Sequence, residues 1–242
     1  MCTVTFIPVR GTTLITSNRD EKTARAAAIY PARENYNGAQ LIFPRDAQAG
    51  GSWIGMKENG DAAVLLNGAF LPHPPATGYR RSRGLIFLDV LSAPKPGRTL
   101  QQLSLNGIEP FTMILFEAGC LYEFRWDGTE KFTKQLPAHR PHIWSSATLY
   151  DGFMIRKREQ WFASFLNNHP QPTQQDVLHF HQFGGEGHQQ TDLKMSRDNG
   201  YATVSITSLL LTAERGSLRY TDLATQQTRE QKIEFLSTTT PL

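Results

Sequence analysis

The sequence has 242 residues, of which 39% are hydrophobic and 19% are charged. This composition is typical of a globular protein and excludes a disordered chain, and the length suits one large domain with an ample core. The net charge is only +3 and the arginines are scattered along the chain. We therefore expect a single domain over residues 1–242 that has no nucleic-acid surface.

Cysteine usage and the start of the chain indicate the compartment. Two cysteines are too few for a disulfide framework, and Cys120 lies in an apolar run that predicts a buried strand. No charged segment followed by an apolar core opens the chain, and no apolar run reaches the ~18 residues that a membrane span needs. We predict a cytoplasmic protein without a membrane span, and the oligomeric state stays open.

The chain opens with two runs rich in β-branched residues, 3–9 and 12–16, which predict strands. Arg10-Gly11 separates them, so we expect a hairpin. The polar run 17–21 (Ser-Asn-Arg-Asp-Glu) follows directly. One interpretation is a strand end that brings Arg19 and Asp20 to the N-terminus, with Glu21 in water. The other is a solvated turn that caps a following helix, because Asn and Asp cap well and Glu suits a first turn.

Turn signals about every ten residues in the first half predict many short strands, and helical spacing begins later. Strands followed by helices and then by strands again are typical of two sheets with helices outside them. Residues 94–97 and the glycine-rich run 184–188 are expected to be loops. Further strands are predicted at 52–57, 62–67, 111–117, 120–126, 203–212, 218–222 and 232–236, and helices at 84–91 after a Ser82 cap, 151–168 and 176–183.

The second residue carries the most chemistry. Removal of Met1 would leave Cys2 with a thiol and a free α-amine on one residue. Their reference pKa values, near ~8.5 and ~7.7–8.0, both lie close to neutrality. The amine can take the thiol proton, and the thiolate can then attack a carbonyl. In this interpretation Arg19 favours the thiolate and Asp20 holds the α-ammonium group.

The Met-Cys opening followed by Ser-Asn-Arg-Asp-Glu resembles the NRDE family, also called the Transport and Golgi Organization family. The runs 50–55 (Gly-Gly-Ser-Trp-Ile-Gly), 59–67 and 82–84 (Ser-Arg-Gly) fit the same family. The resemblance is specific through about residue 92. It identifies the chain as one NRDE-type domain, and that family in turn resembles the cysteine class of N-terminal-nucleophile hydrolases.

The resemblance implies an α+β fold, an αββα sandwich of two mainly antiparallel sheets with the nucleophile at the start of a central strand. It also implies hydrolysis of a carbon–nitrogen amide bond through Cys2. Asp20 would orient the α-amine, Arg19 would tune the thiol or bind substrate, and Asn67 matches the Asn that donates to the oxyanion hole in that class. We expect Asn18, Trp53 and Arg83 to contact the small-molecule amide.

The resemblance leaves an alternative from another class. Eukaryotic members of the family are linked to haem or lipid-thioester handling, so the scaffold could carry haem or a hydrophobic ligand without turnover. Haem would need an axial ligand, which Cys2 or one of the seven histidines could supply. Under the hydrolase interpretation we expect no cofactor.

The sequence departs from the hydrolase pattern at three places. Those enzymes usually place an Arg three residues before the catalytic Asp, whereas here Arg19 immediately precedes Asp20 and Ser17 occupies that offset. Those enzymes use a second Asn midway along the chain, whereas the segment 142–149 offers serines. Many family members carry an Arg in a Thr-Arg-Ser-Thr-like stretch, whereas this chain has residues 202–205 (Ala-Thr-Val-Ser) with Arg197 upstream.

Two other groups of residues are candidate binding sites. His179, His181 and His188 lie close in sequence, but two histidines at His-x-His spacing diverge by about 200° on a helix. We therefore expect no metal site. The arginines at positions 80, 81 and 83 precede a capped helix and suit either an anion site or a solvated basic loop.

Overall fold

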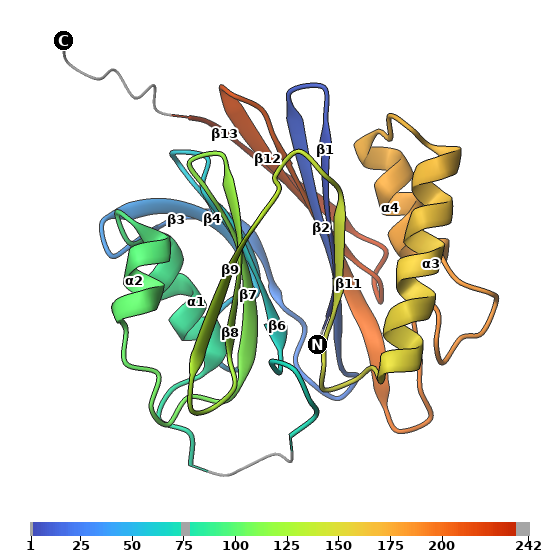
Figure 1. Cartoon of the computed structure of the whole chain (residues 1–242), viewed down its shortest axis with the longest axis horizontal. Helices are drawn as coiled ribbons and strands as arrows, with labels where there is room; N and C mark the ends of the chain where they lie inside the picture. Colours follow the sequence, from blue (N-terminus) through green and yellow to red (C-terminus); the bar gives the residue numbers. More distant parts are fainter. Residues whose placement is uncertain (1, 74–77, 236–242) are drawn as a thin grey trace.

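The structure is a computed structural model that describes residues 2–73 and 78–235, with only the backbone of Cys2. Two antiparallel sheets pack face to face, and helices cover their outer faces (Figure 1). The helices α1 (Arg83–Ser92) and α2 (Pro96–Gln102) lie on one side of the sandwich, and α3 (Gly152–Asn168) and α4 (Gln174–Phe183) lie on the other. The predicted αββα sandwich is confirmed.

The six-stranded sheet has the order β10-β1-β2-β11-β12-β13 and lies against α3 and α4. The seven-stranded sheet has the order β3-β4-β5-β6-β7-β8-β9. Every pairing in both sheets is antiparallel. The strands of the first sheet are β1 (Cys2–Val9), β2 (Thr12–Lys22), β10 (His142–Ser145), β11 (Tyr201–Leu211), β12 (Arg215–Asp222) and β13 (Thr228–Glu234). Those of the second are β3 (Ile29–Tyr36), β4 (Ala39–Arg45), β5 (Ile54–Lys57), β6 (Ala62–Asn67), β7 (Phe111–Glu117), β8 (Cys120–Trp126) and β9 (Lys131–Leu136).

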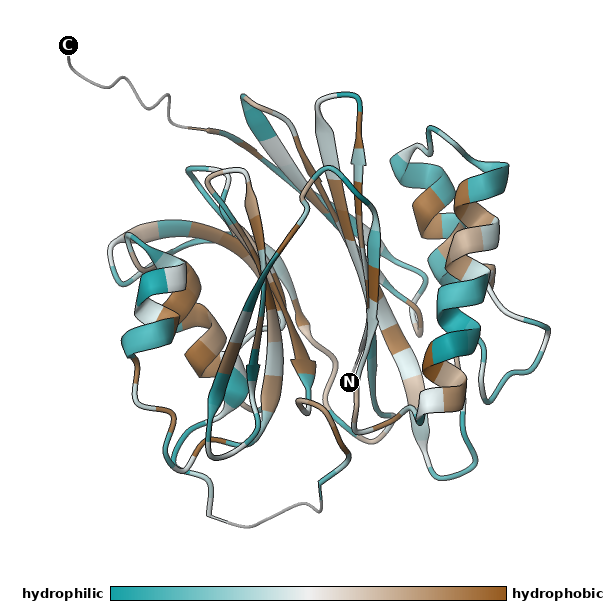
Figure 2. Cartoon of the chain, in the orientation of Figure 1, coloured by the Kyte–Doolittle hydropathy of each residue, from teal (hydrophilic) through white to brown (hydrophobic). Residues whose placement is uncertain are grey.

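Two apolar cores result from the alternation of side chains along the strands. On β1, Val4 and Phe6 are fully buried in the core between the sheets, whereas Ile7 belongs to the core beneath α3 and α4. On β2, Ile15 and Leu14 divide in the same way. Apolar and polar residues accordingly alternate along the strands (Figure 2). Both central strands are therefore covered on both faces.

The first hairpin is confirmed, with Arg10 and Gly11 at φ values of 43° and 76°. Two positive φ angles are what a two-residue type I′ turn requires. The run 17–21 continues β2, which ends at Lys22; residues 17–19 pair with β1 on one side, and the whole run pairs with β11 on the other. The helix-capping interpretation of this run is therefore wrong. The ladder to β11 holds these residues in a central strand.

The helix predicted after Ser82 is confirmed, because the Ser82 hydroxyl accepts a hydrogen bond from the Leu85 amide at 3.3 Å. The loop predicted at 94–97 is wrong in its second half, since Pro96 begins α2. Proline suits a first helical position, where no N–H is needed. Cys120 begins β8 as predicted but is only half-buried, because it lies beside the turn that joins β7 to β8. Leu236, the end of the last predicted strand, lies outside the described residues.

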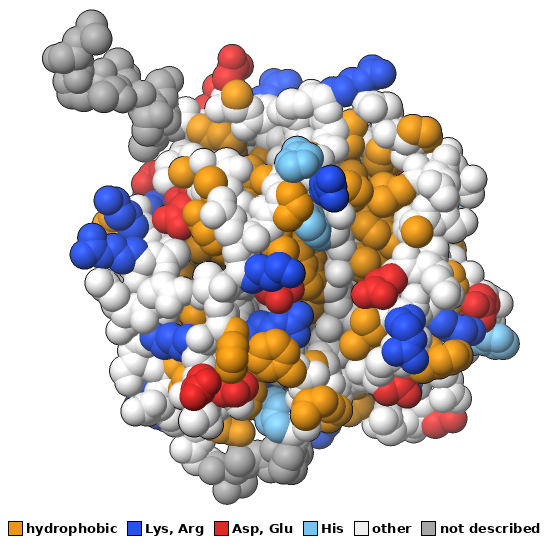
Figure 3. Space-filling view, viewed as in Figure 1, with side chains coloured by type: hydrophobic (Ala, Val, Ile, Leu, Met, Phe, Trp, Pro, Cys, Tyr) orange, Lys and Arg blue, Asp and Glu red, His pale blue; other side chains and the backbone are white. Residues whose placement is uncertain are grey.

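The surface shows no single charged patch on the face drawn in Figure 3, where basic side chains are interspersed with acidic ones. None of the helices formed by residues 2–73 and 78–235 is long and apolar enough to cross a membrane.

Candidate active site

The register of the first hairpin relates the chain's start to the polar run on β2. Cys2 lies directly opposite Arg19 in the β1–β2 ladder. Residues paired in this way occupy the same face of an antiparallel sheet, so position 2 shares the inter-sheet face with Arg19, as Val4 and Phe6 do. The Cys2 side chain itself and Met1 lie outside the described residues. Asp20, the next residue after Arg19, is on the opposite face of β2.

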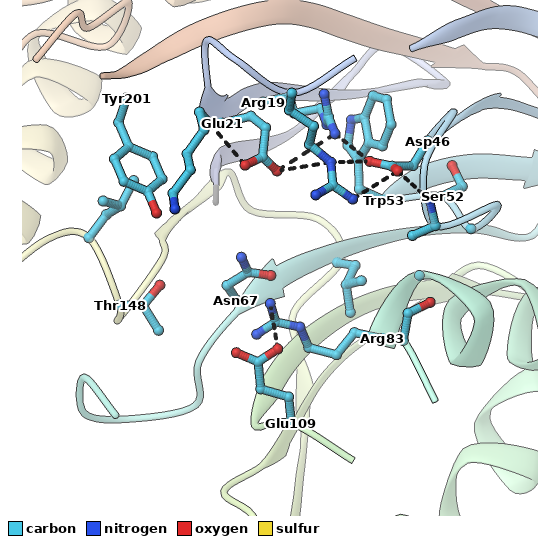
Figure 4. Close-up of a pocket in the computed structure, with 18 of the residues that line it drawn as sticks. Arg19, Glu21, Asp46, Ser52, Trp53, Asn67, Arg83, Glu109, Thr148 and Tyr201 are labelled. Atoms are coloured by element: carbon cyan, nitrogen blue, oxygen red, sulfur yellow. Dashed lines mark hydrogen bonds and ion pairs between the residues drawn. The ribbon is translucent and has the colours of Figure 1, made fainter. Parts of the chain in front are cut away.

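Arg19 borders a cleft of about 750 Å³ where the ends of β2 and β6 meet (Figure 4). Five basic and three acidic side chains line it, with few large apolar ones. The lining includes Arg19, Glu21, Lys22, Arg25, Asp46, Gly51, Ser52, Trp53, Leu65, Asn67, His73, Ser82, Arg83, Gly84, Glu109, Thr148, Leu149, Arg197, Asn199 and Tyr201. The structure thus brings Arg19, Trp53, Asn67 and Arg83 to one cleft.

Arg19 is fixed in place from two directions. Its Nη2 lies 2.6 Å from Oδ2 of Asp46, and its guanidinium lies 4.4 Å from the centroid of the Trp53 ring. Trp53 is 7% exposed, and its indole N–H has no hydrogen-bond acceptor among the described residues. Trp53 therefore both packs in the core and forms a wall of the cleft.

Asp46 is the anion that organises this side of the cleft. It accepts hydrogen bonds from Nε and Nη2 of Arg25, both at 2.9 Å, and from the Ala49 amide at 2.7 Å. Burial alone would raise the pKa of Asp46, but the hydrogen bonds from Arg25 and Ala49 and the charge of Arg19 lower it overall. Asp46 is therefore a stable counter-ion at neutral pH.

Asn67 is the last residue of β6 and is half-buried at the cleft wall. Its backbone carbonyl accepts a hydrogen bond from the Ser146 hydroxyl at 2.8 Å, which fixes the end of the strand. Its side-chain amide has no hydrogen-bond partner within the described part of the chain, and it points into the space between two ion-paired clusters (Figure 4). An amide held in this way is available to a ligand.

Asp20 is completely buried behind the sheet, on the side of α3. It accepts a hydrogen bond of 2.6 Å from the Tyr150 phenol and one of 2.7 Å from the Thr203 hydroxyl. Burial raises the pKa of Asp20, whereas the charge of the amino terminus, the two hydrogen bonds and the charge of Arg158 act to lower it. Arg19 and Asp20 therefore serve different sides of the sheet.

Arg158 extends this buried polar group. It is 0% exposed, its guanidinium lies 3.5 Å from the Tyr150 ring centroid, and its Nη2 donates to the carbonyls of Thr191 and Asp192. Its Nε and Nη1 have no hydrogen-bond partner among the described residues. The buried cation is placed to stabilise the ionised form of Asp20 through space.

Asn18 does not reach the cleft. Its Nδ2 donates to the carbonyls of His181 and Leu193, and its Oδ1 lies 2.7 Å from Nδ1 of His181. The other ring nitrogen of His181 lies 2.8 Å from the Thr5 hydroxyl. Burial lowers the pKa of His181 to about 3, so the ring is neutral, with Nδ1 donating to Asn18. Asn18 thus ties β2 to α4, and the structure gives no support for a contact with substrate.

The histidines on α4 differ in their surroundings. His179 and His181 are both on α4, His181 is buried, and His179 is exposed. No cluster of three or more metal-ligating side chains occurs among residues 2–73 and 78–235.

Each of the three arginines near α1 has its own hydrogen-bond or ion-pair partners in the protein. Arg83 lies 3.0 Å from Glu109 and also donates to the Pro110 carbonyl. Arg81 pairs with Asp89 on α1 itself, and Arg80 donates to the carbonyls of Ser104 and Asn106. Only Arg83 of the three lines the cleft, so the three do not form a shared anion site.

The structure brings four further residues to this region that the sequence does not predict, namely Asp46, Glu109, Tyr150 and Thr203. They lie 26 to 183 residues in sequence from the predicted site residues that they contact, which are Arg19, Asp20 and Arg83, and no local pattern marks these contacts. Asp46 followed shortly by Gly50 and Gly51 is a turn signal, which is the one local hint at that position.

Similar solved structures show which fold this is. A penicillin V acylase from Agrobacterium tumefaciens is 11% identical, with a TM-score of 0.61 over 94% of this chain and 84% of that one. A variant of conjugated bile acid hydrolase from Clostridium perfringens is 9% identical, with a TM-score of 0.64 over 97% and 96%. An N-acylethanolamine-hydrolyzing acid amidase orthologue from Caenorhabditis elegans is 11% identical, with a TM-score of 0.59 over 86% and 92%. The fold is therefore the N-terminal-nucleophile hydrolase fold.

The sequence itself was compared with family models and with curated proteins. No curated protein matches it. The model of the family described as Transport and Golgi organisation 2 matches residues 1–196, which is most of the chain. This protein belongs to the Transport and Golgi organisation 2 family.

Proposed function

We propose that this protein hydrolyses the carbon–nitrogen amide bond of a small molecule with Cys2 as the nucleophile. The observation that carries the proposal is the register of β1 on β2, in which Cys2 is the partner of the cleft residue Arg19. The fold adds support, because the similar structures include an acylase, a bile acid hydrolase and an acid amidase.

The proposed reaction needs the α-amine of Cys2, and therefore removal of Met1. The amine takes the thiol proton, and the thiolate sulfur bonds to the carbonyl carbon of the amide. The oxyanion that forms accepts a hydrogen bond from Asn67. The carbon–nitrogen bond then breaks, and the ammonium group of Cys2 gives its proton to the leaving amine. Water hydrolyses the resulting thioester, which releases the carboxylic acid and restores the thiol.

Two further residues support this scheme by charge. Asp20, buried behind β2 and bonded to Tyr150 and Thr203, would orient the α-ammonium group. Arg19 would favour the thiolate through its positive charge, held in place by Asp46 and Trp53. Trp53 and Arg83 would contact substrate as walls of the cleft.

The test combines intact mass spectrometry with an activity panel. We expect the purified protein to lack Met1 and to hydrolyse at least one of a set of N-acyl amides and acylated amino acids. Cys2→Ser should abolish most turnover without affecting folding, since the exchange is almost isosteric and a hydroxyl is a much poorer nucleophile near neutral pH. A protein that keeps methionine throughout would lack the proposed base and would contradict the scheme.

The same preparation tests the carrier alternative. Haemin is titrated into the wild type and into protein with Cys2 blocked by iodoacetamide, and the Soret band is followed. Tight haemin binding that depends on Cys2, together with no turnover on the whole panel, would reject the hydrolase and favour haem transport.

A further inference from the structure

The cations of the cleft differ in how they are neutralised. Arg19 and Arg25 both contact Asp46, at 2.6 Å and 2.9 Å, and Arg83 contacts Glu109 at 3.0 Å. Each of these guanidinium groups thus has a carboxylate of the protein as its counter-ion, and the cluster around Asp46 is visible as a network of dashed lines in Figure 4. These three arginines need no anionic ligand.

Lys22 and Arg197 are different. Among the residues that the structure describes, neither the Lys22 ammonium nor the Arg197 guanidinium lies within 4.0 Å of a carboxylate oxygen. The Lys22 ammonium lies 5.9 Å from the Tyr201 ring centroid. Arg197 donates from Nη2 to the Leu149 carbonyl and from Nε to the Gln190 carbonyl, at 3.2 Å and 3.3 Å. Neutral carbonyls hold the Arg197 guanidinium in position without cancelling its charge.

The fold brings these two cations to one end of the cleft. Lys22 is the last residue of β2 and pairs with Tyr201, the first residue of β11. The Arg197 amide in turn donates to the Tyr201 carbonyl at 2.8 Å, so the turn that carries Arg197 closes on the same ladder end. All three residues line the cleft, as Asn67 does from the opposite sheet.

We propose that the substrate carries a carboxylate group that Lys22 and Arg197 bind at the β2–β11 end of the cleft. This inference rests on the proposed function and names the substrate class. Two cations without counter-ions in a partly enclosed cleft raise the local concentration of anions and strengthen their binding. A substrate with an uncharged amide and an apolar remainder would leave both charges uncompensated. Arginine also presents a fork of donors that suits a carboxylate.

The test measures binding, so that it does not depend on turnover. The Cys2→Ala protein is titrated with two matched pairs of probes that differ only by a carboxylate or a carboxamide. Benzoylglycine and benzoylglycinamide carry the group on the amine side, and N-benzylsuccinamic acid and N-benzylsuccinamide carry it on the acyl side. We expect the acid of at least one pair to bind about tenfold or more tightly than its amide, and that pair identifies the side.

Substitutions then assign the preference to residues. Lys22→Met and Arg197→Gln should each reduce the acid-to-amide ratio by at least threefold, and Arg197→Lys should restore part of it because the charge returns. The matched control is Lys194→Met, because Lys194 is exposed and outside the cleft lining. The preference should also weaken as salt is raised.

The outcomes separate this inference from the proposed function. Equal binding of acid and amide in both pairs, no detectable binding of either acid, or an unchanged ratio in both variants would overturn it. A carboxylate preference in a protein that turns over no amide would reject the hydrolase and retain the anion site. Turnover of amides without any carboxylate preference would reject the anion site alone.

Discussion

Tyr150 and Asp20 are joined by a hydrogen bond of 2.6 Å across 130 residues of sequence, with the phenol donating to a carboxyl that is completely buried. The tyrosine comes from the segment just before α3, and the carboxyl comes from the central strand β2. The bond therefore links the helical layer to the strand that carries Arg19. It also connects the buried cation Arg158 to Asp20, since the guanidinium packs on the same tyrosine ring.

Tyr150→Phe tests whether this bond serves the reaction. The ring contact with Arg158 is kept, whereas Asp20 loses a donor that lowers its pKa. Loss of a buried hydrogen bond to a charged group should cost about 1.5–3 kcal/mol of stability. The pKa of Asp20 should rise further, so the pH below which kcat/KM falls should move upward. The measurement is a pH–rate profile together with urea denaturation.

The matched control for this substitution is Tyr30→Phe, which removes a phenol that donates to the exposed Gln227 at 3.1 Å. Its stability and its profile should stay close to those of the wild type. A Tyr150→Phe protein that loses stability while its pH profile is unchanged would show that Asp20 has only a structural role.

The central hairpin and the capped helix could be predicted from the sequence because their signals are local. The β-branched runs on either side of Arg10-Gly11 have one favourable turn type, and Ser82 is followed by an apolar helical repeat. By contrast, β3 and β9 have no comparable signal. Both are edge strands with mostly exposed or half-buried residues, so no apolar alternation marks them. The helix α2 has only 7 residues and begins at Pro96, where the sequence predicts a loop.

For each contact in the candidate site, the sequence predicts only one of the two interacting residues. Cys2, Arg19 and Asp20 follow from their chemistry and the predicted hairpin, and Asn67 follows from the resemblance to N-terminal-nucleophile hydrolases. Their partners come from distant segments that the tertiary fold brings together, and a single sequence holds no record of such pairings. Asn18 is the opposite case, because the sequence places it in the site and the structure does not bring it to the cleft. It shares the motif with Arg19 but, one residue earlier on a strand, it faces α4.

Asn67→Ala tests the oxyanion assignment. The Asn67 side chain makes no hydrogen bond within the described part of the chain, so its removal should change stability little. If it donates to the oxyanion, kcat should fall by roughly 10²–10³-fold, with a smaller change in KM. Asn59→Ala is the control, since Asn59 lies at the tip of the β5–β6 hairpin, outside the cleft lining, and its side chain hydrogen-bonds Asp61. A kcat within threefold of the wild type would remove Asn67 from the mechanism.

His181 predicts how stability depends on pH. Its pKa is about 3 in the folded protein and about 6.5 when unfolded, because burial disfavours the charged ring. Between these values the unfolded state binds more protons, so stability is complete above pH 6.5 and is lost as the pH falls toward 3. The slope should approach about 1.4 kcal/mol for each pH unit.

The measurement is the free energy of unfolding by urea at several pH values between 4 and 7.5. Asp20 and Asp46 also have shifted pKa values. The informative quantity is therefore the difference between the wild type and His181→Gln, which cannot titrate. That variant should be less stable at pH 7.5, and its disadvantage should shrink as the pH falls. Parallel curves for the two proteins would contradict the assignment of a neutral, buried His181.

Gly51→Ala tests how the cleft wall is held together, and it needs no substrate. A Cβ at Gly51 would lie 2.3 Å from the Gly84 carbonyl carbon and 2.6 Å from the Leu85 nitrogen. These are backbone atoms at the start of α1, where Ser52 also donates to the Gly84 carbonyl, so the helix cannot yield by turning a side chain. We expect the free energy of unfolding, measured by urea denaturation, to fall by about 3 kcal/mol.

Gly152→Ala is the control, because the nearest atom to its added Cβ is the flexible end of Arg156 at 3.3 Å. Its stability should stay within about 0.5 kcal/mol of the wild type. Equal stability of the two variants would mean that the 50–54 segment and α1 are not in direct backbone contact, and the cleft wall formed by Gly51, Ser52 and Gly84 would lose its basis.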